Sequence, residues 1–369
     1  MKRKSNFELM RIVSMIMIII WHLILFGNFY ESSSGMTRIF LDFLKVLLVV
    51  HVNSFILLSG HFQCEKEFKF SKFLKLFNLI WFYKVIILLI VLFIGFTSLS
   101  TLDILKNLSP INYNDYWFLG SYLVLYLISP MLNKVINNSS KKSLLKYIIV
   151  IFLIVSILST FTIEEAFFNN YGYSISNFIL LYFIGAYIRK YPIKIKKLTN
   201  KTKQLLLIGG YLFFSLFNFL LLYFSYQIEN INSISNYISS IFKSSFYYDN
   251  PFVIICSILF FLFFKNLNIK SSKVINLISS TVLGVYLIHN NKLLRGFVFD
   301  CFGNGSLMTN GLKVFLFLII QSLLLFIICS LIELIRIYLF KLINRFELTK
   351  KIKYKLKSFI DSFGVNLRW

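Results

Sequence analysis

The stretch LMRIVSMIMIIIWHLILFG at residues 9–27 is apolar except at Arg11, Ser14 and His22. An α-helix needs about 20 residues to cross a bilayer, and this stretch is close to that length. Similar runs recur along the chain, which has 369 residues, 57% of them apolar and only 15% charged. A soluble domain carries about 25% charged residues. The sequence therefore excludes a soluble globular or disordered protein and predicts a polytopic membrane protein of α-helices.

Ten apolar segments follow one another along the chain. They lie at about 9–27, 39–61, 73–97, 116–136, 144–161, 173–188, 205–226, 251–264, 274–290 and 312–340. The eighth segment is short for a bilayer, whereas the tenth is long enough to extend past one. We therefore expect an all-α bundle of about ten transmembrane helices, which forms one membrane domain over residues 1–343.

Basic residues are concentrated in alternate loops. The chain has 39 Lys and Arg against 15 Asp and Glu, a formal net charge of +24. Most of the basic residues fall in four loops and the C-terminal tail, at 62–72, 137–143, 189–204, 265–273 and 344–369. With ten spans these loops share one side with both termini, and the positive-inside rule assigns that side to the cytosol. We expect a multi-pass plasma-membrane protein with cytosolic termini, and no nucleic-acid partner.

The two ends of the chain carry different signals. Lys2, Arg3 and Lys4 before the first apolar segment resemble a signal peptide, but no small-residue cleavage pattern follows, so we expect a retained span. Residues 344–369 predict a basic amphipathic tail on the anionic inner leaflet, in contact with membrane lipids. The four cysteines show neither a CxxC pair nor metal-ligand spacing with histidine, so we expect no disulfide framework and no metal.

Arg11 and His22 are the clearest polar pair inside a span. They are eleven residues apart, about three helical turns, so they share one face and lie roughly 16 Å apart along the axis. A histidine can take a proton from a hydroxyl near neutral pH, and an arginine can hold a phosphate. The alternative is an arginine that snorkels to the interface and a structural histidine. The spacing leaves both interpretations open.

The second and third spans also hold polar residues. Ser59 and Gly60 form a small pair that allows close helix approach. His51 is either a second catalytic group or a hydrogen-bonded polar residue, and we favour the second interpretation. Lys84 either snorkels or faces a cavity, and the sequence does not decide between these.

Three residues at the outer ends of spans are candidate substrate contacts. Trp117 opens the fourth span, where an aromatic belt at the interface is the default explanation. Tyr286 and His289 end the ninth span, where His289 either reaches an outside acceptor or sits in the interface. Glu333 and Arg336, three residues apart in the last span, predict an ion pair on one helix face rather than a cofactor contact.

These motifs together resemble a known family. The opening from Asn6 to His22, with a basic residue, ten intervening residues and a histidine, is similar to that of the acyltransferase family 3 membrane proteins. The segments 53–60, ending in Ser-Gly, 117–130 and 283–289 are similar to three further family signatures. The resemblance runs in order from residue 6 to about 340 and implies the same ten-span arrangement.

The resemblance implies transfer of an acyl group, usually acetyl, from cytosolic acyl-CoA to a hydroxyl of a cell-surface glycan or its lipid-linked precursor. It implies that His22 is the essential base or acyl-transfer group, that Arg11 contacts CoA, and that Ser59 and Gly60 form a packing or donor-binding element. Trp117, Tyr286 and His289 are then the expected substrate contacts. Because the chain ends soon after its last span, we expect no appended hydrolase-like domain.

Other classes compete with this interpretation. A transporter or flippase for a lipid-linked oligosaccharide has the same topology, but it needs no acyl-CoA and tolerates loss of His22. A polysaccharide polymerase needs a large, arginine-rich outer loop, which the chain lacks. A non-enzymatic scaffold is disfavoured by the number of polar residues within the spans. The sequence does not indicate the acceptor, the oligomeric state or the route of the acyl group.

Overall fold

The computed structural model describes residues 4–95, 99–109, 116–162, 170–192, 198–303 and 310–343. Every regular element in these ranges is a helix. Eight helical stretches in the described residues are long and apolar enough to cross a membrane. The prediction of an all-α polytopic membrane protein is therefore confirmed, while the tail at 344–369 lies outside the described residues.

The eight long stretches match eight of the ten predicted segments. They are α1 (Ser5–Phe26), α3 with α4 (Gly35–Leu48, His51–Gln63), α5 (Phe70–Ile94), α7 (Trp117–Asn138), α8 with η1 and α9 (Lys141–Phe152, Leu153–Leu158, Ser159–Phe161), α11 (Asn200–Ile228), α12 with η2 and α13 (Ser233–Lys243, Ser244–Phe246, Pro251–Asn266), and α17 (Gly311–Ile343). The eighth segment, short in the sequence, is therefore part of a longer helical stretch that begins at Ser233.

The other two predicted segments form shorter helices. The sixth is α10 (Ile175–Lys190), and the ninth is divided into α14 (Lys273–Ser279) and α15 (Val282–His289). Three further helices connect the spans: α2 (Phe29–Ser32), α6 (Thr101–Leu108) and α16 (Lys292–Phe302).

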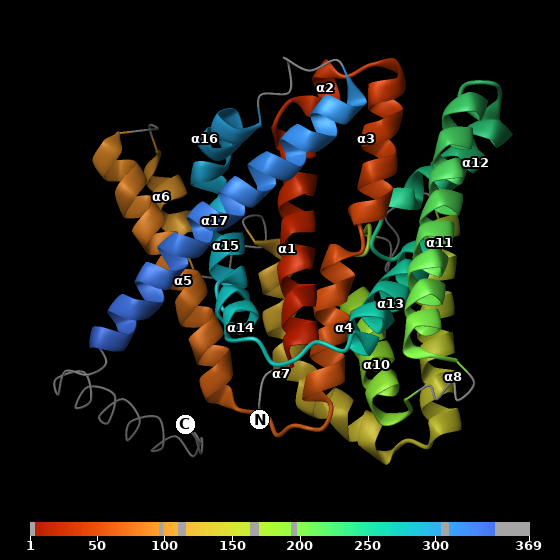
Figure 1. Cartoon of the computed structure of the whole chain (residues 1–369), viewed down its shortest axis with the longest axis horizontal. Coiled ribbons are helices and arrows are strands. Elements are labelled where there is room, and N and C mark those ends of the chain that lie inside the picture. Colours follow the sequence, from red (N-terminus) through yellow and green to blue (C-terminus); the bar gives the residue numbers. More distant parts are fainter. Residues whose placement is uncertain are drawn as a thin grey trace.

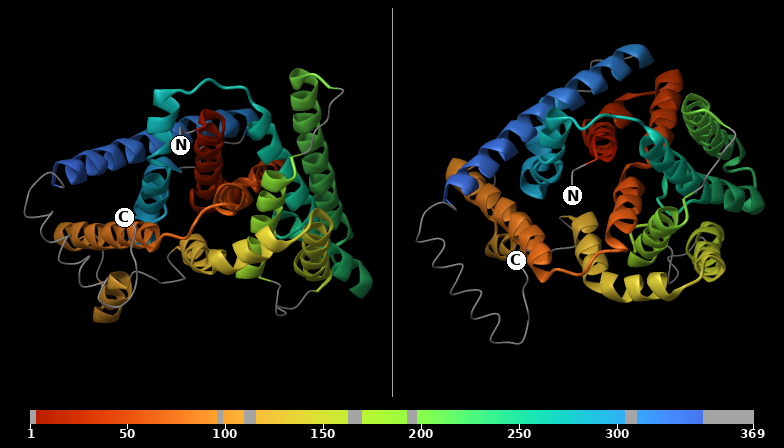
Figure 2. Two further views of the ribbon diagram at one scale, coloured as in Figure 1. Left: turned by 90° about the horizontal axis from the view of Figure 1, so that it is seen from below. Right: turned by 60° about the horizontal axis from the view of Figure 1, so that its bottom comes forward.

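Successive spans alternate in direction (Figure 1). The first residues of α1 and the last residues of α17 both lie toward the lower end of the molecule, as an even number of crossings requires. Figure 2 shows α1 inside the bundle, with α17 running obliquely across one side and α11 standing on another. The exposure of side chains agrees with this placement of α1 and α11. Ile19, Leu23 and Ile24 of α1 are fully buried, whereas Phe213 of α11 is 63% exposed on the lipid-facing side.

Glycine sets the crossing of α4 and α10. A Cβ atom at Gly60 would lie 2.1 Å from the carbonyl oxygen of Tyr182, and one at Gly185 would lie 2.2 Å from that of Leu57. The two backbones therefore touch, as the small pair in the sequence indicated. This contact holds one wall of the site described below.

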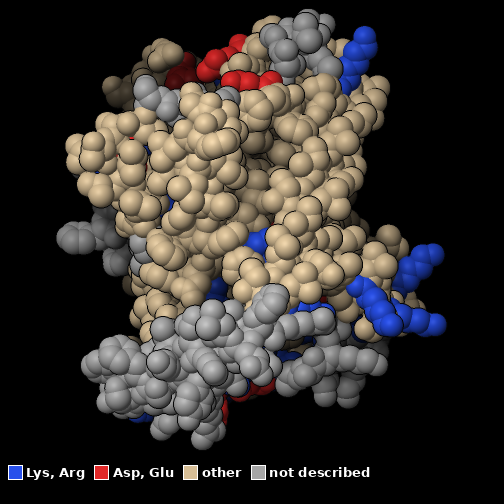
Figure 3. Space-filling model, turned by 90° about the vertical axis from the view of Figure 1, so that its left-hand side faces the viewer, with Lys and Arg blue, Asp and Glu red and all other residues tan. Residues whose placement is uncertain are grey.

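Charge is segregated along the axis of the bundle. On the face shown in Figure 3, most of the visible Lys and Arg lie toward the lower end, and a broad band with few charged atoms covers the middle. Such a band is what a bilayer requires of a spanning surface. The cytosolic assignment of the lower end stays a prediction of the positive-inside rule.

Candidate active site

A cavity of about 360 Å³ lies inside the bundle between α1, α4, α7 and α15. Six residues singled out in the sequence contribute to its wall, namely Arg11, His22, His51, Ser59, Trp117 and Tyr286. Ligand pockets span about 300–1,000 Å³, so this one has room for the reacting part of a substrate. The tertiary structure thus brings polar residues from four helices to one cavity, whose wall also contains many apolar side chains.

His22 reaches the cavity from α1 and is hydrogen-bonded on its other side. Its Nδ1 atom lies 3.1 Å from Nε2 of His289 in α15. His289 Nδ1 in turn lies 2.6 Å from the carbonyl oxygen of Val285. His289 is 0% exposed and lies behind His22 rather than in the cavity wall. The sequence suggested that His289 reaches an outside acceptor or sits in the interface, and the structure places it at neither position.

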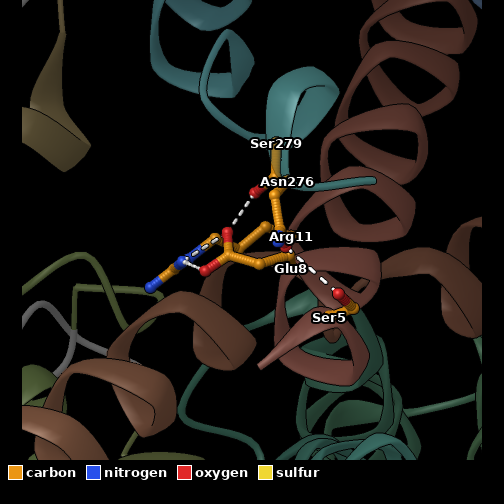
Figure 4. Close-up of polar contacts among 5 residues, drawn as sticks. All are labelled: Ser5, Glu8, Arg11, Asn276 and Ser279. Carbon is orange, nitrogen blue, oxygen red and sulfur yellow. Dashed lines mark hydrogen bonds and ion pairs between the residues drawn. The ribbon is translucent and has the colours of Figure 1, made fainter. Parts of the chain in front are cut away.

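Arg11 is held by a carboxylate from its own helix (Figure 4). Its Nη1 atom lies 2.7 and 2.8 Å from the two carboxylate oxygens of Glu8. Glu8 also accepts a hydrogen bond from Ser279 of α14. The remainder of the guanidinium points away from Glu8, and the Arg11 side chain is 33% exposed. Sequence reasoning gave Glu8 no role, although its position three residues before Arg11 was a signal for this pair.

Ser59 and its neighbour Gly60 have separate roles. Ser59 lines the cavity, and its hydroxyl donates to the carbonyl oxygen of Phe55 at 2.9 Å and lies 3.2 Å from the hydroxyl of Tyr122. Gly60 is turned toward α10 and does not contribute to the wall. Of the predicted donor-binding pair, only the serine therefore lines the cavity.

Aromatic rings form a further part of the cavity wall. Trp117 stacks on Tyr248, with ring centroids 5.7 Å apart, and also contacts Tyr173 at 4.3 Å. Trp117, Tyr248 and Tyr286 all line the cavity. Trp117 therefore faces the interior of the bundle, which the expectation of an interfacial belt did not anticipate. Tyr248, in the turn after η2, was missed because nothing in its local sequence marks it.

His51 has no hydrogen-bond partner among the described residues. It is 1% exposed, it lines the cavity, and both of its ring nitrogens are unpaired. Its neighbours are aromatic: the ring centroids of Trp21 and Tyr248 lie 5.6 and 5.7 Å away. Among the described residues His51 therefore lacks the partner that the favoured interpretation, a hydrogen-bonded structural residue, requires.

Lys84 neither snorkels nor faces the cavity. It is 1% exposed, and its Nζ donates to the carbonyl oxygen of Ser109 at 2.6 Å and lies 3.5 Å from that of Lys106. These carbonyls lie at the C-terminal end of α6, where a helix concentrates partial negative charge. Lys84 thus ties α6 to α5, a role that depends on a contact outside its own span.

The predicted pair of Glu333 and Arg336 is confirmed. Arg336 donates to both carboxylate oxygens of Glu333, at 2.6 and 2.7 Å, and Tyr83 of α5 donates to the same carboxylate. Gly284 makes room for it, since a Cβ atom there would lie 2.5 Å from the Glu333 carboxyl carbon. This network fixes α15, which carries Tyr286 and His289, against α17 and α5.

The fold and the site define a multi-pass membrane protein with a cavity inside its helix bundle that contains histidine, arginine and serine side chains. A family model described as an acyltransferase domain, that of acyltransferase family 3, matches residues 4–334. The chain belongs to this family and is a membrane acyltransferase, as the motifs indicated. No curated protein and no solved structure matches the chain significantly. In the described ranges no three His, Cys, Asp or Glu residues are grouped to hold a metal ion.

Proposed function

We propose that this acyltransferase moves an acyl group, in the simplest case acetyl, from acyl-CoA to a hydroxyl of a cell-surface glycan or its lipid-linked precursor. The observation that carries the proposal is that one cavity contains both Arg11 and His22, side chains suited to an anion and to proton transfer. Family membership supports acyl transfer in general.

The donor enters from the basic end of the bundle. Positive charge concentrated there attracts the phosphates of CoA. Arg11, whose Nη1 is occupied by Glu8, presents the rest of its guanidinium to the donor. The axial distance from Arg11 to His22 is roughly 16 Å along α1, so an extended thioester arm connects the two residues. The small cavity encloses this arm and leaves the nucleotide outside.

His22 acts as the general base. It takes the proton of the acceptor hydroxyl as the hydroxyl oxygen attacks the thioester carbonyl carbon. The new carbon–oxygen bond forms, the carbon–sulfur bond breaks, and the proton passes from His22 to the departing thiolate. The products are an ester and free CoA, with no other reactant needed.

The aromatic wall binds the acceptor. Trp117, Tyr248 and Tyr286, which line the same cavity as His22, offer flat apolar surfaces with polar edges. Such surfaces suit a sugar ring, which has apolar faces and hydroxyls around its rim. The acceptor hydroxyl then lies between the aromatic wall and the base.

The test is acylation of surface glycan in cells that carry the wild-type chain, no copy, or His22→Ala at equal membrane levels. Removal of a general base lowers the rate about 10²–10⁴-fold, so ester-linked acyl groups should be found with the wild type alone. His61→Ala is the matched control, because His61 is buried outside the cavity wall. Equal acylation in all cells, with altered glycan export, would favour a transporter and contradict the proposal.

A further inference from the structure

The hydrogen-bond chain behind His22 has a defined direction. The carbonyl oxygen of Val285 can only accept, so the Nδ1 atom of His289, 2.6 Å away, carries a proton. In a neutral imidazole the other nitrogen is then an acceptor. The 3.1 Å contact between His289 Nε2 and His22 Nδ1 therefore requires the proton to be on His22 Nδ1.

We propose that His289 is a positioning residue that holds His22 in the tautomer with Nδ1 protonated and Nε2 free. The proposal rests on the role of His22 as the base. Because Nδ1 is occupied by His289, Nε2 is the nitrogen left for the acceptor hydroxyl in the cavity that His22 lines. In the opposite tautomer, Nε2 would carry a proton and could not take another.

The same bond survives the reaction. When His22 takes the acceptor proton on Nε2, it keeps the proton on Nδ1 and still donates to His289. The imidazolium thus stays oriented toward the thiolate that must receive its proton. His289 needs no change of tautomer at any step.

The surroundings keep His289 in place. It is fully buried, and its helix is held on two sides. Tyr116 donates to the carbonyl oxygen of Leu287 at 2.7 Å, and Gly284 packs against the carboxylate of Glu333. A ring fixed in this way maintains one hydrogen-bond direction, whereas a ring with free rotation would not.

The test reads the tautomer directly. Full-length protein labelled with ¹⁵N-histidine is placed in lipid bilayers, and solid-state NMR measures which ring nitrogen of each histidine is protonated. The chain has 4 histidines, and spectra of His51→Gln and His61→Gln assign the signals that are not His22 or His289. The expected result is that His22 is protonated on Nδ1 and unprotonated on Nε2. The opposite tautomer of His22 would overturn the proposal without any substitution at His289.

Two substitutions of similar size separate hydrogen bonding from packing. In His289→Gln the amide oxygen can still accept from His22, so the tautomer should persist and most of the activity should remain. In His289→Leu no acceptor remains, so His22 should shift toward Nε2 protonation. The kcat for acyl transfer should fall about 100-fold or more, with KM for both substrates unchanged, because His289 lies outside the cavity wall.

Failure of this proposal and failure of the proposed function give different results. An unchanged His22 tautomer in His289→Leu, or equal activity of the Gln and Leu variants, would overturn the proposal. Absence of acyl transfer by the wild type would instead contradict the proposed function, while the spectrum still decides the tautomer. If His289→Leu does not fold, the wild-type spectrum and the Gln variant decide the question.

Discussion

The polar residues of the cavity differ in how well they are paired. Arg11 has a carboxylate and His22 has a second imidazole, whereas neither nitrogen of His51 has a partner in the part of the chain that the structure describes. A buried polar group without a partner costs about 1–3 kcal/mol. Arg11 and His22 are thus oriented by their partners, whereas His51 is not oriented by a hydrogen bond from the described residues.

Glu8→Gln should raise the KM for acyl-CoA about 10-fold and change kcat less. The substitution removes the charge that orients Arg11, which corresponds to a loss of about 1.4 kcal/mol in donor binding. Steady-state kinetics with purified protein measures this. Ser279→Ala is the control, because it removes the hydrogen bond that the Ser279 hydroxyl donates to Glu8 and leaves the ion pair. An unchanged KM would show that Arg11 does not bind the donor.

His51→Leu should raise the melting temperature of the protein without substrate. It removes two unpaired buried nitrogens and keeps an apolar side chain among the aromatic rings. Asn53→Leu on the same helix is the matched comparison and should lower the melting temperature, since Asn53 donates to the carbonyl oxygen of Tyr248 at 2.8 Å. A lower melting temperature for both variants would mean that His51 has a hydrogen-bond partner in the membrane-embedded protein.

At the scale of elements, backbone contacts between helices shape the cavity. Ser59 faces the cavity only because the next residue, Gly60, lets α4 touch α10. Likewise Tyr286 is placed by α15, which the Glu333 network holds against α17 and α5. The site therefore depends on contacts between helices that are made by residues outside the cavity wall.

Gly60→Ala should destabilise the protein by about 1–3 kcal/mol or more, because its new methyl group would lie 2.1 Å from a carbonyl oxygen and force α4 away from α10. Thermal unfolding in detergent measures the change. Gly209→Ala in α11 is the matched control: its methyl group meets nothing within 4 Å, and Ala is the better helix former. Similar losses of stability for Gly60→Ala and Gly209→Ala would contradict the importance of the contact between α4 and α10.

At the scale of the whole molecule, the even number of crossings and the charge distribution predict the orientation. In a Cys301→Ser background, Lys141→Cys should react with a membrane-impermeant thiol reagent only after permeabilisation. Ser233→Cys, at the opposite end of the bundle, should react in intact cells. Both positions are exposed, and the other three cysteines are buried. The reverse pattern would invert the predicted topology and move the donor to the other side.

The sequence by itself determined the helical class, the apolar segments and the shared face of Arg11 and His22. These features are local, because span length and helical periodicity depend on consecutive residues. It also indicated the family, through motifs that are each contained in one segment. The pair of Glu333 and Arg336 was predictable for the same reason, since its residues are three apart.

Only the tertiary structure decided the partners of the site. His22 and His289 are 267 residues apart in the chain, and no pattern within either helix indicates that their rings meet. The unpaired state of His51 and the contact of Lys84 with α6 depend on which neighbours the fold supplies. A side chain's type and periodic position are local, but its hydrogen-bond partner is set by packing between distant segments.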